Sequence, residues 1–311
     1  MKFKFFIGLI LFILFIENSL GNEEIIDDSD KRKFIIGYSG APLSVDYWRK
    51  LKDSLFSKAK ELDIVVIDFT SDLFTYEAQK KNLMNAIELK VDGMIIGSVS
   101  SKTAELMEDF QTNKIPVIAV GVPIQNKWVT TSITINNSNA ARMAGSYILK
   151  ELMKRENEAK RIIILCGDKS QKDAITRAFV PTEMFTNAGY HVTNYYSKGW
   201  SGKHSLTDAI KEYSKYKNEI IASFSCFADA TIASVEAAEH FGLRPLQVGF
   251  DMDVNMKKMM INGRLDATII QDPQKIGQVG IESMAKLLNS DTELPKIINI
   301  SPLLVISDNL R

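Results

Sequence analysis

Acidic, amide and aromatic side chains lie at the ends of apolar, β-branched runs in this chain or in the segments that follow them. Aromatic rings beside carboxylates can hold a small cation through charge and cation–π contact. Hydroxyl-rich molecules instead need hydrogen bonds at their edges and flat apolar surfaces on their faces. Both are chemistries of binding rather than of bond making. The residues of this set are Tyr47, Trp48, Asp173, Trp200, Phe227, Asp229, Asp251 and Gln271.

Sequence patterns typical of catalysis are missing. The chain contains no G-x-S-x-G elbow, no P-loop and no H-E-x-x-H pair. His191, His204 and His240 lack the spacing of metal ligands, so we interpret each as a solvated or capping residue. We therefore expect neither an enzyme nor a metal or other cofactor.

Composition narrows the class of protein further. The 311 residues are 45% hydrophobic and 24% charged, which suits globular cores and suggests about two domains. Lys and Arg number 38 against 38 Asp and Glu. This balance argues against nucleic acid as a partner, because binding nucleic acid needs a basic face that displaces counterions.

The N-terminus has the pattern of an export signal. Lys2 and Lys4 precede an apolar run at residues 5–15, which is too short for a comfortable membrane span. We predict a signal peptide at 1–21 and a flexible, polar leader at 22–32, which places the protein in the periplasm. An uncleaved anchor stays an alternative, because the exit of the apolar run is not a clean small-x-small site.

Beyond residue 33, continuously apolar runs alternate with amphipathic segments such as 47–62, 78–90 and 140–154. Such runs are typical of parallel sheets covered by helices on both faces. Right-handed crossovers then predict an α/β protein with two doubly wound sheets. The expected strands are 34–38, 64–69, 94–99 and 117–122 in one series, and 161–166, 191–196, 220–225, 246–250 and 267–271 in a second.

Two such series in one exported chain predict a two-lobed receptor with a cleft between the lobes. Ligands of open parallel sheets bind at the carboxyl ends of the strands. The residues that follow each expected strand are therefore the candidates for ligand contact.

Residues 248–288 read VGFDMDVNMKKMMINGRLDATIIQDPQKIGQVGIESMAKLL and contain V-G-F-D, G-x-L-x-A-T-I-x-Q-x-P and I-G-x-x-G. On these motifs the chain resembles the type I periplasmic binding proteins, close to the ribose- and galactose-binding branch. Weaker similarities are VDGMIIG at 91–97, IPVIAV at 115–120 and NNSNAARMAG at 136–145. The resemblance implies two lobes, joined by three hinge crossovers, that close around a small ligand. Lactose-repressor-type regulators share this fold, but they begin with a helix-turn-helix, whereas this chain begins with an export signal.

The resemblance also implies roles for individual residues. Asp251 matches an aspartate that accepts hydrogen bonds from sugar hydroxyls, and Gln271 matches a polar residue that binds another hydroxyl. Tyr47 and Trp48 lie where the family has aromatics that stack on a sugar, and Trp200 lies where the second lobe supplies one. Three structural alternatives stay open. Asp251 could cap a helix, Gln271 could bond only to the hinge backbone, and just one of the adjacent pair Tyr47 and Trp48 could enter the cleft.

The departures from the family pattern affect the ligand. Gly121 and Val122 replace an Asp-Arg pair, Asp173 replaces an arginine although Lys172 and Arg177 are nearby, and Phe227 with Asp229 occupies a segment that usually holds an asparagine. The site is then apolar and net acidic. Two ligand classes follow: a sugar, which could be modified or deoxygenated, and a small cationic or methylated amine.

The family's three crossovers predict that lobe one comprises 33–136 and 272–300, and lobe two 137–271 and 301–311. Cys166 ends one expected strand of lobe two, and Cys226 follows its neighbour in the usual strand order. A disulfide and two buried thiols are both compatible with that spacing.

The sequence therefore predicts a monomeric, exported solute-binding protein that delivers a sugar or sugar derivative to the permease of an ABC transporter. The alternative is a periplasmic receptor that reports ligand occupancy to a membrane sensor kinase or chemoreceptor.

Overall fold

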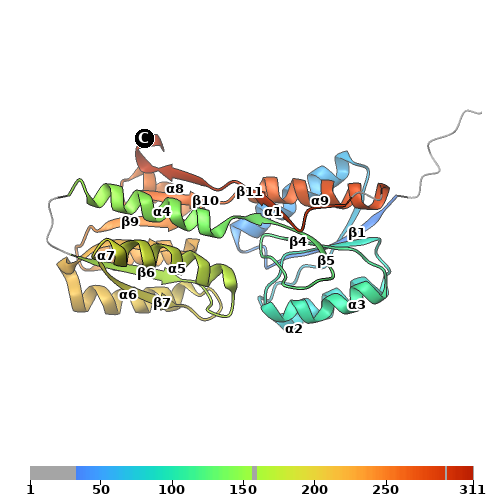
Figure 1. Ribbon diagram of the computed structural model, residues 1–311, viewed down its shortest axis with the longest axis horizontal. Coiled ribbons are helices and arrows are strands. Elements are labelled where there is room, and N and C mark those ends of the chain that lie inside the picture. The colour runs from blue at the N-terminus through green and yellow to red at the C-terminus, as the bar shows by residue number, and fades with distance from the viewer. Residues whose placement is uncertain (1–32, 156–159, 291–292, 311) are drawn as a thin grey trace, which may run out of the picture. The chain divides into compact units, whose positions relative to one another are not determined.

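The computed structural model describes residues 33–155, 160–290 and 293–310. The predicted signal peptide and leader lie outside these residues. Two six-stranded sheets, each covered by helices, make up the described fold, which confirms the predicted α/β class (Figure 1). Within the described ranges, no helix has the length and apolar character to span a membrane.

The first lobe has a wholly parallel sheet with the order β11-β5-β4-β3-β1-β2. Its core has two layers, because Ile95 packs with residues of α1 and α9 while its neighbours Met94 and Ile96 pack with α2 and α3. Its strands are β1 (Ile35–Ser39), β2 (Val65–Asp68), β3 (Gly93–Ile96), β4 (Val117–Val120), β5 (Val129–Ile135) and β11 (Ile297–Ile300). Its helices are α1 (Asp46–Glu61), α2 (Tyr76–Glu88), η2 (Ser101–Leu106), α3 (Met107–Thr112) and α9 (Pro273–Asn289).

The second lobe has a sheet with the order β12-β10-β9-β8-β6-β7, in which β12 alone is antiparallel to its neighbour. Helix α4 packs beside α5, and α6 beside α7. Its strands are β6 (Arg161–Cys166), β7 (His191–Tyr196), β8 (Ile220–Ser225), β9 (Leu246–Phe250), β10 (Ala267–Ile270) and β12 (Leu303–Ile306). Its helices are α4 (Asn137–Leu152), α5 (Lys172–Asn187), α6 (Gly202–Tyr216), η3 (Lys217–Glu219), α7 (Ala228–His240), α8 (Val254–Ile261) and η4 (Ser307–Leu310).

The chain passes between the two sheets three times. It leaves β5 for α4, returns from β10 to α9, and passes from β11 to β12. The first crossover is closed by Asn136, whose side chain accepts a hydrogen bond from Asn139 N and so caps α4. The predicted three-crossover, two-lobed fold is confirmed.

Several strands differ from the sequence expectation. Strand β4 ends at Val120 because Gly121, with a φ of 72°, turns the chain away from the sheet. The expected strands do not include β5, whose sequence VTTSITI is rich in hydroxyl residues, or β11 and β12 at the sheet edges. Both edge strands are only four residues long, and β11 (IINI) is interrupted by an asparagine.

Cys166 ends β6 and Cys226 directly follows the neighbouring strand β8, as expected. Cys226 N donates to Leu165 O, which ties the end of β8 to β6. Both residues are buried and both are free thiols, so the structure has the thiol alternative rather than the disulfide. Burial, followed by the neighbouring Cys226, raises the pKa of the Cys166 thiol far above its usual range.

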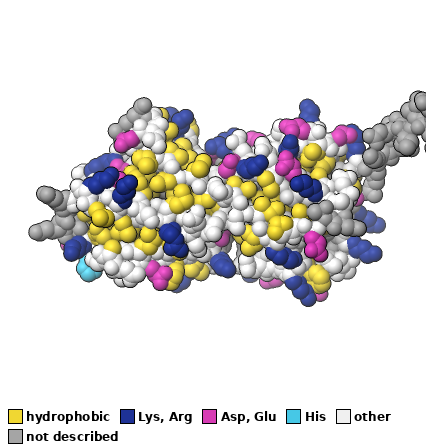
Figure 2. All heavy atoms as spheres, turned by 45° about the horizontal axis from the view of Figure 1, so that its top comes forward, with side chains coloured by type: hydrophobic (Ala, Val, Ile, Leu, Met, Phe, Trp, Pro, Cys, Tyr) yellow, Lys and Arg dark blue, Asp and Glu magenta, His cyan; other side chains and the backbone are white. Residues whose placement is uncertain are grey.

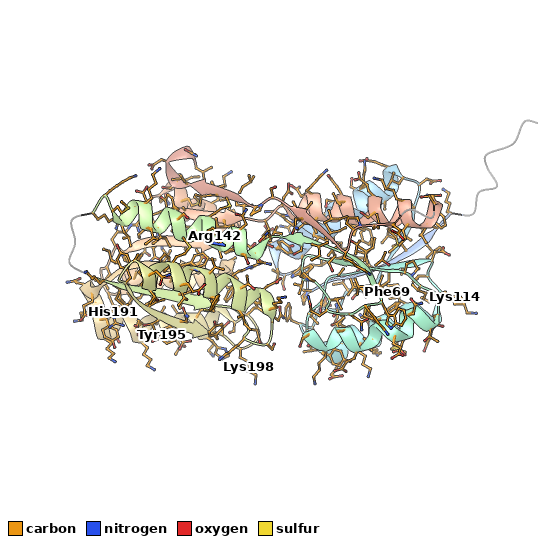
Figure 3. All side chains as sticks on the ribbon, in the orientation of Figure 1. Phe69, Lys114, Arg142, His191, Tyr195 and Lys198 are labelled. Atoms are coloured by element: carbon orange, nitrogen blue, oxygen red, sulfur yellow. The ribbon has the colours of Figure 1, made fainter. Side chains whose placement is uncertain are left out.

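Basic and acidic side chains are interspersed on the face that Figure 2 shows. His191 begins the edge strand β7, with Tyr195 further along it and Lys198 in the loop that follows (Figure 3). All three histidines are exposed. Among the described residues, no group of His, Cys, Asp or Glu is arranged to hold a metal ion.

Candidate functional site

Asp251 occupies the turn directly after β9. Its φ of 69° is unusual for a residue with a side chain, and two hydrogen bonds hold it there: Asp251 N donates to Ile269 O, and Thr268 Oγ1 donates to Asp251 O at 2.7 Å. The carboxylate oxygen Oδ1 accepts from Gln271 Nε2 at 2.7 Å. Asp253, not Asp251, caps the next helix, so the capping alternative for Asp251 is wrong.

Gln271, just after β10, links Asp251 to a buried arginine. Its Oε1 accepts from Arg177 Nη2 at 3.3 Å, so both ends of its amide bond to side chains rather than to the hinge backbone. Arg177 also donates from Nε to Asn137 Oδ1 at 2.7 Å and from Nη1 to Cys226 O at 3.1 Å. Its exposed fraction is 6%. A buried guanidinium needs such a set of acceptors.

Sequence reasoning left Arg177 and Asn137 out of the candidate set. Asp173 stands where the family has an arginine, and Arg177 follows it by four residues in the same helix. Residues four apart share a helix face, so Arg177 restores a cation to this side of the site from one turn further along α5. That spacing was the available signal.

Together these residues form a polar belt, which we define as Asp251, Gln271, Arg177, Asn137 and Asp173. Burial raises the pKa of Asp251, while Arg177 and the Gln271 hydrogen bond lower it. Burial likewise raises the pKa of Asp173, against Arg177 and a hydrogen bond with Asn137. One arginine thus sits between two partly desolvated carboxylates.

In lobe one, the aromatic pair begins α1. The Tyr47 and Trp48 rings meet edge to face, with centroids 5.1 Å apart. Trp48 packs so closely on the lobe that a Cβ at Gly97 would lie 2.2 Å from its Cζ3. A Cβ at Gly121 would lie 3.0 Å from Trp48 Cη2 and 2.9 Å from Tyr47 Oη. The large tryptophan ring therefore requires that no side chain stand at position 121.

The Tyr47 hydroxyl lies within electrostatic range of the polar belt. Burial raises the pKa of Tyr47, as does the charge of Asp251, and Arg177 opposes them. Its Oη is buried without a hydrogen-bond partner in the described structure. A buried hydroxyl without a partner is costly unless a ligand supplies one. Of the pair, Trp48 is buried in the core of lobe one, whereas Tyr47 is half-buried and its hydroxyl lies near the charged groups of the belt.

Lobe two supplies the second aromatic pair. The Trp200 and Phe227 rings meet edge to face at 5.3 Å, and the Trp200 ring lies on Gly167, where a Cβ would come within 2.2 Å. Trp200 has a φ of 55°. The Arg177 guanidinium carbon lies 5.9 Å from the Trp200 ring and 3.9 Å from the ring of Phe250. Arg177 thus already occupies the cation position beside these rings.

Asp229 is set apart from the polar belt. It lies in the first turn of α7, is exposed, and packs near Gly202. Burial and the charge of Asp253 raise the pKa of Asp229. In the described structure no hydrogen bond joins it to the belt.

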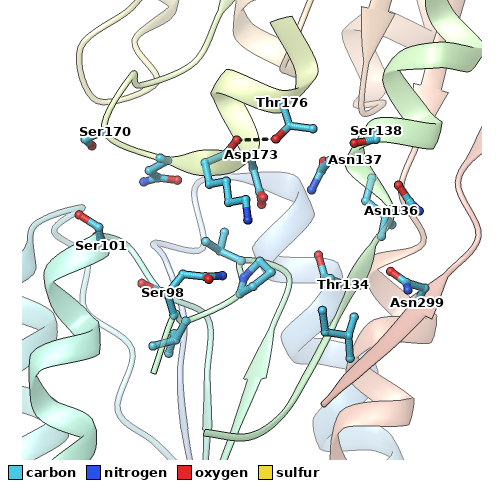
Figure 4. Close-up of a pocket in the computed structure, with 18 of the residues that line it drawn as sticks. Ser98, Ser101, Thr134, Asn136, Asn137, Ser138, Ser170, Asp173, Thr176 and Asn299 are labelled. Atoms are coloured by element: carbon cyan, nitrogen blue, oxygen red, sulfur yellow. Dashed lines mark hydrogen bonds between the residues drawn. The ribbon is translucent and has the colours of Figure 1, made fainter. Parts of the chain in front are cut away.

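A cavity of about 460 Å³ adjoins the belt, with Asn137 and Asp173 in its wall (Figure 4). Loops after β3 and β4 line it from lobe one, and the starts of α4 and α5 line it from lobe two. Beside it, Gln171 Nε2 donates to Val99 O across the lobes at 3.5 Å.

Comparison with known proteins places these features in a family. The model described as "Periplasmic binding protein domain" matches residues 36–292. The ribose import binding protein RbsB of Bacillus subtilis (strain 168) is 21% identical over 274 residues, covering 85% of this chain and 84% of the relative. The protein of the same name from Escherichia coli (strain K12) is 25% identical over 262 residues, covering 80% and 83%.

Solved structures show the same fold. GanP, a glucose-galactose binding protein from Geobacillus stearothermophilus, has a TM-score of 0.82 at 18% identity, covering 90% of this chain and 99% of its own. A periplasmic solute-binding protein of an ABC transporter from Actinobacillus succinogenes 130z, with bound D-allose, has a TM-score of 0.81 at 21% identity, covering 89% and 99%.

Proposed function

The chain belongs to the periplasmic binding protein family, whose members bind ligands rather than transform them, and from that premise we propose that it binds a neutral sugar between its lobes. The observation that carries the proposal is the polar belt facing an unpartnered Tyr47 hydroxyl. Asp251 accepts, Arg177 donates and Gln271 does both, which suits hydroxyl groups that themselves donate and accept. The rings of Tyr47 and Trp200 offer apolar faces from the two lobes.

Arg177 favours the sugar over a cationic amine. A cationic ligand between Trp200 and Asp251 would meet a guanidinium that already lies close to both. Like charges at such range repel, and the low-dielectric surroundings strengthen the repulsion. The names of the relatives, which refer to ribose, glucose, galactose and allose, point in the same direction.

Closure of the lobes would couple binding to transport. A ligand that contacts both lobes favours the closed arrangement by its extra contacts there. We propose that the closed protein, exported to the periplasm with residues 1–21 as its signal, delivers the sugar as a monomer to an ABC permease. The proposed lobe boundaries, 33–136 with 272–300 and 137–271 with 301–311, are supported by the strands that each sheet contains.

Ligand-dependent melting of the purified protein tests this proposal against pentoses, hexoses, polyols, nucleosides and small amines. A ligand at about 100 times its Kd should stabilise the protein by about 2.7 kcal/mol. We expect the shift with a sugar, its loss in Asp251→Ala and Trp200→Ala, and its retention in the control Asp229→Ala. A shift with amines alone, or none with any sugar, would contradict the proposal.

A further inference from the structure

The cavity beside the polar belt lies away from the aromatic rings. Its volume of about 460 Å³ falls in the range of small-molecule sites. None of Tyr47, Trp48, Trp200 and Phe227 lines it. The space between the aromatic faces is therefore not the whole of the cleft.

The cavity nevertheless shares residues with the polar belt. Asn137 and Asp173 belong both to the polar belt and to the cavity wall. On the lobe-one side, Val122 lines the cavity, while Gly121 before it lies against Tyr47 and Trp48. A ligand unit in the cavity would therefore contact two residues of the polar belt, Asn137 and Asp173.

The cavity wall has the chemistry of hydroxyl recognition. Asp173 and Thr176 on α5 face Ser98 and Thr134 across it, with Asn299 at one side (Figure 4). Serine and threonine hydroxyls and asparagine amides both donate and accept hydrogen bonds. The two charged residues of the wall, Lys172 and Asp173, carry opposite signs, so the wall has no net charge that selects an ion. Without an aromatic ring, the wall holds its occupant by edges rather than by a stacked face.

We propose that this cavity is a second subsite, which takes a second hydroxylated unit joined to the sugar at the belt. The ligand is then a disaccharide or a glycoside with a hydroxylated aglycone. Val122 and Asp173 line the cavity with short side chains, which leave room for this second unit. The inference rests on the proposed sugar-binding function and specifies its substrate class.

Calorimetric titration of the purified protein tests the subsite. The probes are the monosaccharides that shift the melting temperature, together with their methyl glycosides and their 1,2-, 1,3-, 1,4- and 1,6-linked disaccharides. We expect one disaccharide to bind at least about tenfold more tightly than its parent monosaccharide, since it adds more than one hydrogen bond.

Variants locate that gain. Thr176→Trp fills the cavity from α5 and should abolish the disaccharide's advantage while leaving monosaccharide affinity within about twofold of wild type. Ile175→Trp is the matched control, because Ile175 is 42% exposed on the same helix and outside the cavity wall. If Thr176→Trp does not fold, Ser101→Trp takes its place, because Ser101 lines the cavity from lobe one. The control for Ser101→Trp is Lys102→Trp at the next residue.

The outcomes separate the two proposals. If monosaccharides bind and no disaccharide gains affinity, the subsite is refuted and the sugar-binding function stands. A disaccharide gain that survives both filling variants also refutes the subsite, because the second unit then lies elsewhere. If no sugar of either size binds, both proposals fall.

Discussion

Among the residues of the site, Asp251 and Trp200 hold backbone angles that favour glycine. Their φ values are 69° and 55°, and such a conformation costs a residue with a side chain about 1–2 kcal/mol. The two residues come from the loop after β7 and the turn after β9, and they point a ring and a carboxylate at the same arginine. Strain of this kind persists where the surrounding contacts fix it, and it is concentrated at binding sites.

Asp251→Asn should stabilise the ligand-free protein and weaken binding. Because burial raises the pKa of Asp251, the folded state binds its proton more tightly than the unfolded state does. The protonated Asp251 carboxyl contributes its whole stabilisation at pH values below the ordinary aspartate pKa. That contribution is lost as the pH rises through the raised pKa of the folded state, so the charged carboxylate opposes folding at pH 7. Asparagine keeps an oxygen for Gln271 Nε2 without that charge.

We expect a higher melting temperature for ligand-free Asp251→Asn at pH 7, with the difference from wild type shrinking as the pH is lowered through the raised pKa. Sugar affinity should fall about 10- to 100-fold, because a hydrogen bond from the sugar to a charged carboxylate is replaced by a weaker one to a neutral amide. Melting curves and calorimetry measure both. A lower melting temperature at pH 7 would show that the carboxylate stabilises the folded protein instead.

Gly121→Ala should destabilise the protein by about 2–4 kcal/mol, because a φ of 72° strains alanine and its Cβ would meet Tyr47 and Trp48. Gly189→Ala is the matched control: its φ is 86°, but nothing lies within 4 Å of the added carbon. Urea unfolding of both variants separates strain from collision. Equal losses would mean that the aromatic pair moves freely away from position 121.

The sequence could identify only part of this site. Asp251 and Gln271 directly follow strands, so the rule that ligands bind at strand ends finds them. Arg177 and Asn137 belong to helices. Their roles depend on how far the long Arg177 side chain reaches from its helix to its hydrogen-bond partners. The pattern of one strand or helix carries no such information. Asp229, in the first turn of α7, has no hydrogen bond to the belt in the described structure, and its contact with the ligand stays a prediction.

Among the elements, the central strands of lobe two were predictable to the residue. Strands β6, β8 and β9 are almost wholly buried, and their mainly apolar runs predicted their bounds. Strand β5 is buried too, but its Thr and Ser residues bond locally, as when Thr134 Oγ1 donates to Gly121 O at 2.7 Å. Hydropathy alone does not register a strand stabilised in that way.

Asp253 provides an element-scale contrast with Asp251, two residues earlier. Its side chain accepts from Met256 N at 2.7 Å and so caps α8. Asp253→Ala should lower the free energy of unfolding by about 1 kcal/mol and leave sugar affinity unchanged. Urea unfolding and calorimetry measure the two quantities. A loss of affinity equal to that of Asp251→Ala would assign Asp253 to the site.

The paired ends of β6 and β8 make a further prediction. Because Cys166 and Cys226 are free in the structure, protein denatured without a reductant should titrate two thiols per chain with a chromogenic disulfide reagent. Reduced protein serves as the control and should give the same value. A result near zero would show that the protein carries the disulfide.

For the whole molecule, the hydrogen bond from Gln171 to Val99 O is one of the contacts that join the lobes. Gln171→Ala should weaken sugar binding about two- to tenfold, because the closed state then lacks the hydrogen bond from Gln171 to Val99 O. Small-angle scattering of the ligand-free variant should show a larger radius of gyration than wild type. Gln125→Ala, a change of an exposed amide in the same cavity wall, is the control and should alter neither quantity.

The passage of the chain from β11 to β12 has a consequence for how the protein folds during its synthesis. Each sheet receives its final strand from residues 297–306, yet each began more than a hundred residues earlier. A ribosome or an export channel releases the chain vectorially, from its N-terminus onward. Neither lobe can therefore complete its sheet until almost the whole chain has been released. Until then, β5 and β10 have unpaired edges. Protection of those edges by a chaperone would matter most at that late moment of biogenesis.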